Sequence, residues 1–396
     1  MTTTHRPRPQ PTAGPAVRRP LTNFRRNPAS PFRHVDIVLV ACTALATAFG
    51  ALMVYSATRG PVAPYDTSYV KRVGMFAVVG GLLMAATALF DYRKLRDYWP
   101  IIYGVGVISL VLVLALGDAS QGAQRWFDIG PFFQLQPSEP AKLGLIIGFA
   151  GLASHFRGDL DNLRVALLLG LCAVPMALVL VQPDLGTALI SLAIGFAMLV
   201  VAGVRPRILA AVSLVAAMGV AGLLATGILE EYQVDRLTSF SRQDQPAVTE
   251  QDEALRFNLD QAKLTTGSGG FTGKGLFNGP QTRNGFVPEQ RTDFIFTAVG
   301  EQLGFVGAGA LLAVLGAICW RVWRTAQLAR DDFGMLLCTG VLALLVVQIF
   351  ENVGMTMGIM PITGLPLPLV SYGGSSMLST MLALGLVLSV HMRRFT

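Results

Sequence analysis

Charged residues are scarce in this sequence. They make up 14% of its 396 residues, whereas soluble domains carry about 25%. Hydrophobic residues account for 52% of the chain, and the mean hydropathy is +0.54. This balance excludes an ordinary soluble globular protein and predicts an integral membrane protein.

Cysteine and histidine are also scarce, with four of each. The cysteines stand singly in apolar stretches without a CxxC pair, so we expect them to be small buried hydrophobic residues. The histidines are scattered near span ends or in the N-terminal tail. No metal site or histidine-based catalytic constellation is therefore visible in the sequence. The residues concerned are Cys42, Cys172, Cys319, Cys338, His5, His34, His155 and His391.

The net charge of +7 would suggest a nucleic-acid partner in a soluble protein. Here most basic residues stand between apolar segments, where they set the orientation of membrane helices, so we expect no nucleic-acid partner. Residues 1–35 are rich in Pro, Arg and Thr and are expected to form a disordered, basic cytoplasmic tail. No signal peptide is expected, because the first apolar run begins near Asp36 and is long enough to span a bilayer.

Apolar segments of about 20 residues, the length that a bilayer requires, recur from residue 36 onward. They predict an all-α integral membrane protein with about ten transmembrane helices in one polytopic domain, 36–396. The expected spans are 36–56, 71–90, 99–117, 138–155, 163–181, 187–203, 208–228, 293–320, 333–356 and 369–391.

The distribution of Lys and Arg predicts the orientation of these spans. Among the short connecting segments, most basic residues fall on the same side as the N-terminus. Because basic residues concentrate in cytoplasmic loops, both termini are expected in the cytoplasm. One large loop, about 229–292 between spans 7 and 8, is then extracytoplasmic.

This large loop is polar and rich in glycine towards its end. Glu253 to Leu264 has apolar residues at helical spacing and is expected to form a short helix at the membrane interface. Gly267 to Gly285 holds too much glycine for a helix and is expected to close on itself or on a ligand by backbone contacts. Loops held by a rigid scaffold often carry function, so this segment is a candidate for chemistry.

The glycine-rich stretch does not fit a nucleotide motif. In a Walker A loop, Gly273-Lys274 would be followed by Ser or Thr, but Gly275 stands there. A dinucleotide fingerprint lacks its third glycine, because Thr272 occupies that position. Ser138 and Lys142 are four residues apart, so the Ser-x-x-Lys motif of acyl-enzymes is absent as well.

Ionisable residues at membrane depth mark functional sites by default. Glu139 and Lys142 are three residues apart on a helix face and can pair, although Glu139 could equally stabilise a helix start. Asp184 and Asp293 have a helix-capping alternative, and Trp126 an aromatic-belt alternative. Glu301 lies about two turns deeper than Asp293 and requires a partner that the sequence does not reveal.

Two prolines and two glycines between Gly364 and Ser375 predict broken or re-entrant backbone at the start of the last span. Such backbone is tolerated at membrane depth only where it is buried in protein or lines a cavity. The alternative is a plain turn that leads into the helix.

Taken in order, these segments resemble the SEDS family of RodA, FtsW and SpoVE proteins from Gln124 nearly to the C-terminus. Each motif is weak alone, and their ordered combination is highly specific. They are Gln124-Arg-Trp126, Gln136-Pro-Ser-Glu139 with Lys142, Gln182-Pro-Asp-Leu-Gly-Thr187, Gly267-Ser-Gly-Gly270, Gly273-Lys-Gly275, Pro288-Glu289, Thr292-Asp-Phe-Ile-Phe296, Glu301, Asn352-x-Gly-Met355 and Gly364-Leu-Pro-Leu-Pro-Leu-Val-Ser-Tyr-Gly-Gly-Ser375.

The resemblance implies a peptidoglycan glycosyltransferase in the bacterial cytoplasmic membrane. Such an enzyme polymerises lipid II into glycan strands at the outer face and works with a class B penicillin-binding protein. The pattern Gly279-Pro-Gln281 is more similar to RodA, the elongation enzyme, than to FtsW, the division enzyme. The competing hypotheses are an FtsW-like division polymerase, a transporter that flips lipid II, and a scaffold that recruits a cross-linking enzyme.

The resemblance also implies the site. Asp293 is expected to be the catalytic base or to bind a divalent cation, Mg²⁺ or Mn²⁺, and no organic cofactor is expected. Arg291 stands where the family commonly has His, and Gln302 where it commonly has a second Glu. The expected substrate-binding residues are Arg125, Trp126, Glu139, Lys142, Asp184, Gly269, Gly270, Lys274, Gln281, Arg291 and Ser371.

Overall fold

The computed structural model describes residues 34–60, 62–120, 123–130, 133–156, 160–225 and 250–395. The predicted tail, 1–35, and the part of the large loop from 229 to 249 lie almost wholly outside these ranges, and their predictions are not tested.

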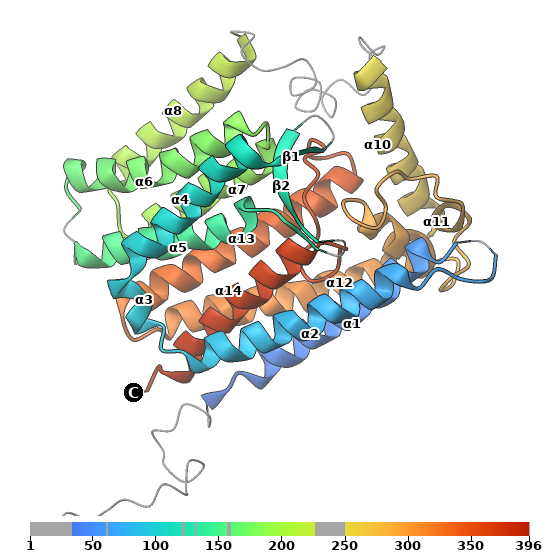
Figure 1. Cartoon of the computed structure of the whole chain (residues 1–396), viewed down its shortest axis with the longest axis horizontal. Helices are drawn as coiled ribbons and strands as arrows, with labels where there is room; N and C mark the ends of the chain where they lie inside the picture. Colours follow the sequence, from blue (N-terminus) through green and yellow to red (C-terminus); the bar gives the residue numbers. More distant parts are fainter. Residues whose placement is uncertain are drawn as a thin grey trace, which may run out of the picture.

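The described chain is a bundle of long helices (Figure 1). Each of the ten expected spans coincides with one helix to within a few residues at most ends, which confirms the mainly helical membrane fold. These helices are α1 (Ile37–Thr58), α2 (Ser68–Leu89), α4 (Trp99–Leu116), α5 (Ser138–His155), α6 (Asn162–Val181), α7 (Leu185–Val201), α8 (Pro206–Ala225), α12 (Ile295–Gln327), α13 (Asp332–Thr356) and α14 (Gly374–Met392).

Seven of these helices, within the described ranges, are long and apolar enough to cross a membrane by length and composition. Two others, α7 and the first part of α8, are apolar but shorter. Membrane character is therefore established, and the number of ten spans stays a prediction.

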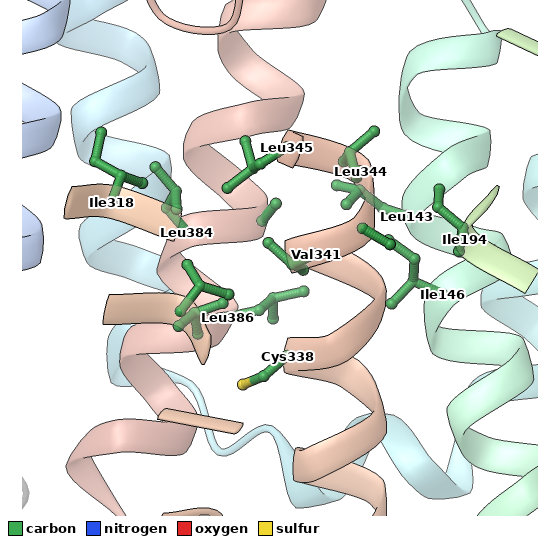
Figure 2. Close-up of a cluster of buried hydrophobic side chains, with 14 of the residues drawn as sticks. Leu143, Ile146, Ile194, Ile318, Cys338, Val341, Leu344, Leu345, Leu384 and Leu386 are labelled. Atoms are coloured by element: carbon green, nitrogen blue, oxygen red, sulfur yellow. The ribbon is translucent and has the colours of Figure 1, made fainter. Parts of the chain in front are cut away.

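The core lies around α13 (Figure 2). Its side chains Cys338 and Val341 are fully buried. They lie between Ile146 of α5 on one side and Ile318 of α12 and Leu384 of α14 on the other. All four cysteines are free. Cys338 therefore packs as the small hydrophobic residue that the sequence predicts.

A small antiparallel sheet adds a feature that the all-α prediction did not contain. It has the order β1-β2-β3, with β1 (Asp118–Ser120), β2 (Ala123–Ile129) and β3 (Phe133–Leu135). These strands connect α4 to α5. With three to seven residues each, they are too short to give a clear alternation of polar and apolar residues, so periodicity does not predict them.

The end of the large loop folds onto α12. Helix α10 (Glu250–Ser268) contains the helix expected at 253–264. The segment expected to be non-helical, Gly267 to Gly285, is so from Gly269 to Gly279. The prediction was wrong at Gly267 and Ser268, where α10 continues, and at α11 (Pro280–Asn284), a short helix that begins with proline. Backbone bonds from Lys274 and Gly275 to the carbonyls of Glu301 and Gln302, both 3.0 Å, close the loop as expected.

Helix α12 departs from the prediction in two ways. It continues to Gln327, beyond the expected end at 320, and it kinks at Gly304, where φ is 64°. A Cβ on Gly304 would lie 2.3 Å from the backbone nitrogen of Gly273. The kink thus lets the glycine-rich loop approach the helix backbone, which only glycine permits.

The segment between α13 and α14 has broken backbone, as the two prolines and two glycines predict. Residues 358–373 contain no helix, and Gly364 and Leu369 have φ values of 73° and 66°. Leu365, Leu367 and Leu369 are all buried in protein. The last helix therefore begins at Gly374, five residues later than expected.

Candidate active site

Asp293 lies two residues before α12 and is half-buried. The N-cap residue of that helix is Phe294, without a side-chain cap, so the capping alternative for Asp293 is not supported. Its carboxylate faces the broken segment, since a Cβ on Gly364 would lie 3.2 Å from Oδ2. The absence of a side chain at Gly364 therefore leaves room next to this carboxylate.

Asn352 of α13 fixes Asp293 relative to the broken segment. Its Nδ2 atom donates to the carbonyl oxygens of Asp293 and Leu365, each at 2.7 Å. One turn earlier, Gln348 donates to the carbonyl of Pro366 at 2.9 Å. The bond from Asn352 goes to the backbone carbonyl of Asp293, so it fixes the position of this residue through its main chain.

Glu139 and Lys142 form the ion pair that their spacing predicts. Lys142 Nζ lies 2.9 Å from Glu139 Oε1, and the two side chains are only 2% and 4% exposed. When an ion pair is buried in this way, removing one partner is strongly destabilising, because the other charge is left uncompensated. The pair stands in the first turns of α5.

Three of the motifs that carry the family resemblance lie together at the start of α5. The backbone nitrogen of Gln136 donates to Ser375 Oγ at 3.0 Å. The Gln136 side chain reaches Asp184 at 3.5 Å. Asp184 caps α7, accepting from the nitrogen and hydroxyl of Thr187 at 3.1 and 2.9 Å. The capping alternative for Asp184 is thus confirmed, and its contact with a substrate stays a prediction.

Arg125 and Trp126 are consecutive residues of β2. Arg125 donates from Nε to the carbonyl of Gln182 at 2.8 Å and from Nη2 to the carbonyl of Pro183. This side chain therefore joins the sheet to the turn before α7. Trp126 is half-buried, and both its substrate role and its aromatic-belt alternative stay open.

Arg291 connects Asp293 to the start of α14. Its carbonyl accepts from the nitrogen of Tyr372 at 2.9 Å. The guanidinium lies 4.8 Å from the ring centre of Tyr69 and 4.0 Å from Glu289. Ser371, the next expected contact, is buried and accepts from the nitrogen of Leu367 at 2.8 Å. Ser371 therefore stabilises the broken segment. The substrate contact expected of it stays a prediction.

The glycine-rich loop packs on α12 beyond Asp293. A Cβ on Gly269 would lie 1.9 Å from the carbonyl oxygen of Gly300, so only glycine fits there. Gly270 has φ 58° and is exposed. Lys274 contacts Ser268 at 2.8 Å and Glu301 at 3.2 Å. The anion-binding role expected of this loop stays a prediction.

The structure shows the partners of Glu301 that the sequence does not reveal. Besides Lys274, it accepts from the nitrogen of Gln281 at 3.0 Å and from the nitrogen and hydroxyl of Thr282 at 2.8 and 2.7 Å. The side chain is fully buried. One carboxylate thus holds both the glycine-rich loop and α11 on α12.

Replacing Glu301 with Ala is expected to loosen this loop. Hydrogen bonds to a charged group are worth about 1.5–3 kcal/mol each, so local opening of 269–285 should become easier by about 2 kcal/mol. Hydrogen exchange of the purified protein would show faster exchange in this segment and unchanged exchange in α13. Glu253→Ala, at an exposed carboxylate of α10, is the matched control; equal exchange in the two variants would contradict the assignment.

Sequence reasoning missed Glu351. This residue precedes Asn352 in α13, is fully buried, and neither carboxylate oxygen has a hydrogen-bond donor among the described residues. A buried charge without a partner is costly, so a glutamate inside an apolar span was a usable signal.

The expected divalent cation has few ligands from the chain. Among the described residues, no group of three or more His, Cys, Asp or Glu side chains is arranged to hold a metal ion. Mg²⁺ is commonly held by one or two carboxylates together with water and substrate phosphates. The residues around Asp293 fit that mode and do not form an all-protein metal site.

Comparison with known proteins gives a consistent result along most of the chain. The family model described as cell cycle protein, covering FtsW, RodA and SpoVE, matches residues 36–395. The peptidoglycan glycosyltransferase MrdB of Escherichia coli is 34% identical over 364 residues, which cover 91% of this chain and 94% of MrdB. A probable peptidoglycan glycosyltransferase FtsW of Geobacter metallireducens is 35% identical over 379 residues, covering 94% and 98%.

The fold is similar to a solved structure as well. One chain from work on the structural coordination of polymerization and crosslinking by a peptidoglycan synthase complex matches with a TM-score of 0.76 and 32% identity. The match covers 91% of this chain and 99% of that chain.

Proposed function

This chain belongs to the FtsW, RodA and SpoVE family of cell cycle proteins, and we propose that the Asp293 region is the catalytic centre of its peptidoglycan glycosyltransferase activity. One observation supports this placement above the others. Asn352 holds the backbone carbonyl of Asp293, and the carboxylate faces Gly364, which has no side chain. A carboxylate placed in this way can accept a proton from a bound substrate.

In the proposed reaction, the 4-hydroxyl of an incoming lipid II sugar attacks the anomeric carbon of the growing strand. The new C–O bond forms as the bond to undecaprenyl diphosphate breaks, with inversion at that carbon. Asp293 accepts the hydroxyl proton, and the electron pair of the broken bond leaves on the diphosphate. General base catalysis of this kind contributes about 10²–10⁴-fold.

The diphosphate leaving group requires positive charge. Lys142, Arg125 and Lys274 each contact an acceptor in the protein. Arg291, two residues from Asp293, is half-exposed, and its contact with the exposed Glu289 is the longest of the four, at 4.0 Å. We therefore assign Arg291 to the leaving group. A divalent cation, Mg²⁺ or Mn²⁺, bound by Asp293 together with the diphosphate, would supply further charge neutralisation.

The proposed biological role is cell elongation. The RodA-like pattern Gly279-Pro-Gln281 supports it, and the comparably high identity to an FtsW protein favours division as the second candidate. Expression in two bacterial strains, one depleted of its RodA and one of its FtsW, distinguishes the roles. Restored rod shape supports elongation, and restored septation supports division.

The proposed orientation has both termini in the cytoplasm and Asp293 at the outer face. The partner proposed from this arrangement is a class B penicillin-binding protein, which would cross-link the strands as they form. The likeness to a peptidoglycan synthase complex supports such a partner.

The test of the function is polymerisation of lipid II by the purified wild-type protein, with and without a class B penicillin-binding protein. Glycan strands resolved on a gel are expected from the enzyme. A flippase or a scaffold would make none, and a lipid II translocation assay would then separate these two alternatives.

A further inference from the structure

A basic cavity lies at the opposite end of the bundle from α10 and α11. It is formed by α3 (Arg93–Asp97) and the turn between α12 and α13, and has a volume of about 500 Å³. In Figure 1, α3 lies at the left near the C-terminus, whereas α10 and α11 lie at the right. The lining includes Arg93, Lys94, Arg96, Arg330, Asp97 and Asp331.

One of the two acidic side chains of the cavity, Asp331, already accepts hydrogen bonds within the protein. Asp331 accepts from the nitrogen of Gly334 at 2.8 Å, as the cap of α13, and from the hydroxyl of Tyr92. Burial, with the hydrogen bond to Asp331, raises the pKa of Tyr92, so this hydroxyl stays protonated and keeps donating. Arg93 Nε lies 3.7 Å from the same carboxylate.

Three cations at the cavity remain without a carboxylate partner. Lys94, Arg96 and Arg330 are exposed, and in the described part of the chain no carboxylate oxygen lies within 4.0 Å of their charged nitrogens. Four basic and two acidic side chains leave an excess of positive charge in a concave surface. Such a surface concentrates anions.

Apolar side chains next to the cavity place it at the membrane surface. Tyr98 and Ile101, which follow α3 into the span α4, are 57% and 63% exposed, and Leu328 on the other side is 39% exposed. Tyrosine is enriched where a bilayer meets water. The cavity therefore lies at the depth of lipid headgroups, with an acyl-chain surface beside it.

We propose that this cavity binds the headgroup of an anionic phospholipid. The phosphate would lie against Lys94, Arg96 and Arg330, and the acyl chains along Tyr98 and Ile101. Basic pockets between transmembrane helices on the cytoplasmic side recognise such headgroups. The alternative, that these cations only set membrane topology, requires neither a cavity nor an adjacent apolar surface.

The test compares two charge-matched double variants in lipid nanodiscs. Arg96→Gln/Arg330→Gln alters the cavity, whereas Arg205→Gln/Arg207→Gln removes two exposed basic residues from the start of α8, which helix order places on the same side. Native mass spectrometry measures binding of phosphatidylglycerol added to phosphatidylcholine discs. Thermal unfolding in phosphatidylcholine alone checks that both variants fold like the wild type.

The cavity variant is expected to bind phosphatidylglycerol about 20-fold more weakly than the wild type, while the α8 variant binds it like the wild type. Equal loss in both variants, or no loss in either, would overturn the proposal. Inorganic phosphate is the second probe. If millimolar phosphate stabilises the wild type in phosphatidylcholine as much as phosphatidylglycerol does, the site takes free phosphate and the lipid assignment fails.

Discussion

Asp293→Asn is expected to abolish glycan strand synthesis while leaving the protein folded. The amide keeps the size of the carboxylate but cannot accept the hydroxyl proton, so the turnover number should fall by about 10²–10⁴-fold. Folding should survive, because the anchoring bond from Asn352 goes to the backbone carbonyl of Asp293, which the substitution leaves in place. Polymerisation of lipid II by the reconstituted variant is the measurement.

Glu253→Gln is the matched control for this experiment. Glu253 is an exposed carboxylate of α10, in the same large loop, and no proposed step uses it. Its neutralisation removes the same charge from that loop, so a general electrostatic effect would slow both variants equally. Selective loss in Asp293→Asn supports a base or cation ligand, and normal strand synthesis by that variant would remove Asp293 from the mechanism.

The positions of the helices could be predicted from sequence because membrane thickness sets the length of an apolar run. The start of α5 at Ser138 and the end of α13 at Thr356 agree with the expected boundaries. The end of α12 does not, because a helix needs only its own backbone bonds to continue past the bilayer. Hydropathy falls near Arg321, whereas the helix runs to Gln327.

Partners within the site could be predicted only where they are close in sequence. Glu139 and Lys142 lie on one helix face, and Asp184 caps the helix that follows it. Glu301 pairs with Lys274 across the kinked start of α12, and Arg125 reaches the turn before α7. These contacts depend on how distant segments pack, which neither periodicity nor spacing encodes.

The prediction of broken backbone before α14 succeeded for a different reason. Proline restricts the backbone locally and glycine releases it. Their cluster between Gly364 and Ser375 therefore predicts irregular backbone from the local sequence alone. The role of Asn352 in holding that segment did not follow from the sequence. Its two bonds go to the carbonyls of Asp293 and Leu365, which lie 59 and 13 positions away in the sequence.

Lys142→Met is expected to destabilise the protein by about 3–5 kcal/mol, because it leaves the Glu139 carboxylate buried and uncompensated. Both side chains are almost completely removed from solvent, and their atoms are 2.9 Å apart. Methionine retains the volume of the lysine stem, so the loss reports the missing charge and not a cavity. Thermal or denaturant unfolding in detergent measures it.

Lys71→Met provides the control at an exposed lysine near the start of α2. A surface substitution of this kind usually changes stability by no more than about 0.5 kcal/mol. Comparable losses in the two variants would show that the Glu139 carboxylate does not depend on Lys142.

Exchanging the two charges separates pairing from position. Glu139→Lys and Lys142→Glu should each be strongly destabilising alone, since each creates two like charges in a buried site. The double variant should recover much of the loss, because the exchanged residues can pair again three residues apart. Recovery should stop short by about 0.3–1 kcal/mol, since a lysine in the first turn of α5 opposes the helix dipole. If the two losses of stability simply added in the double-mutant cycle, the ion pair would not be what stabilises the start of α5. The contacts of Gln136 with Ser375 and Asp184 would then have to stabilise it instead.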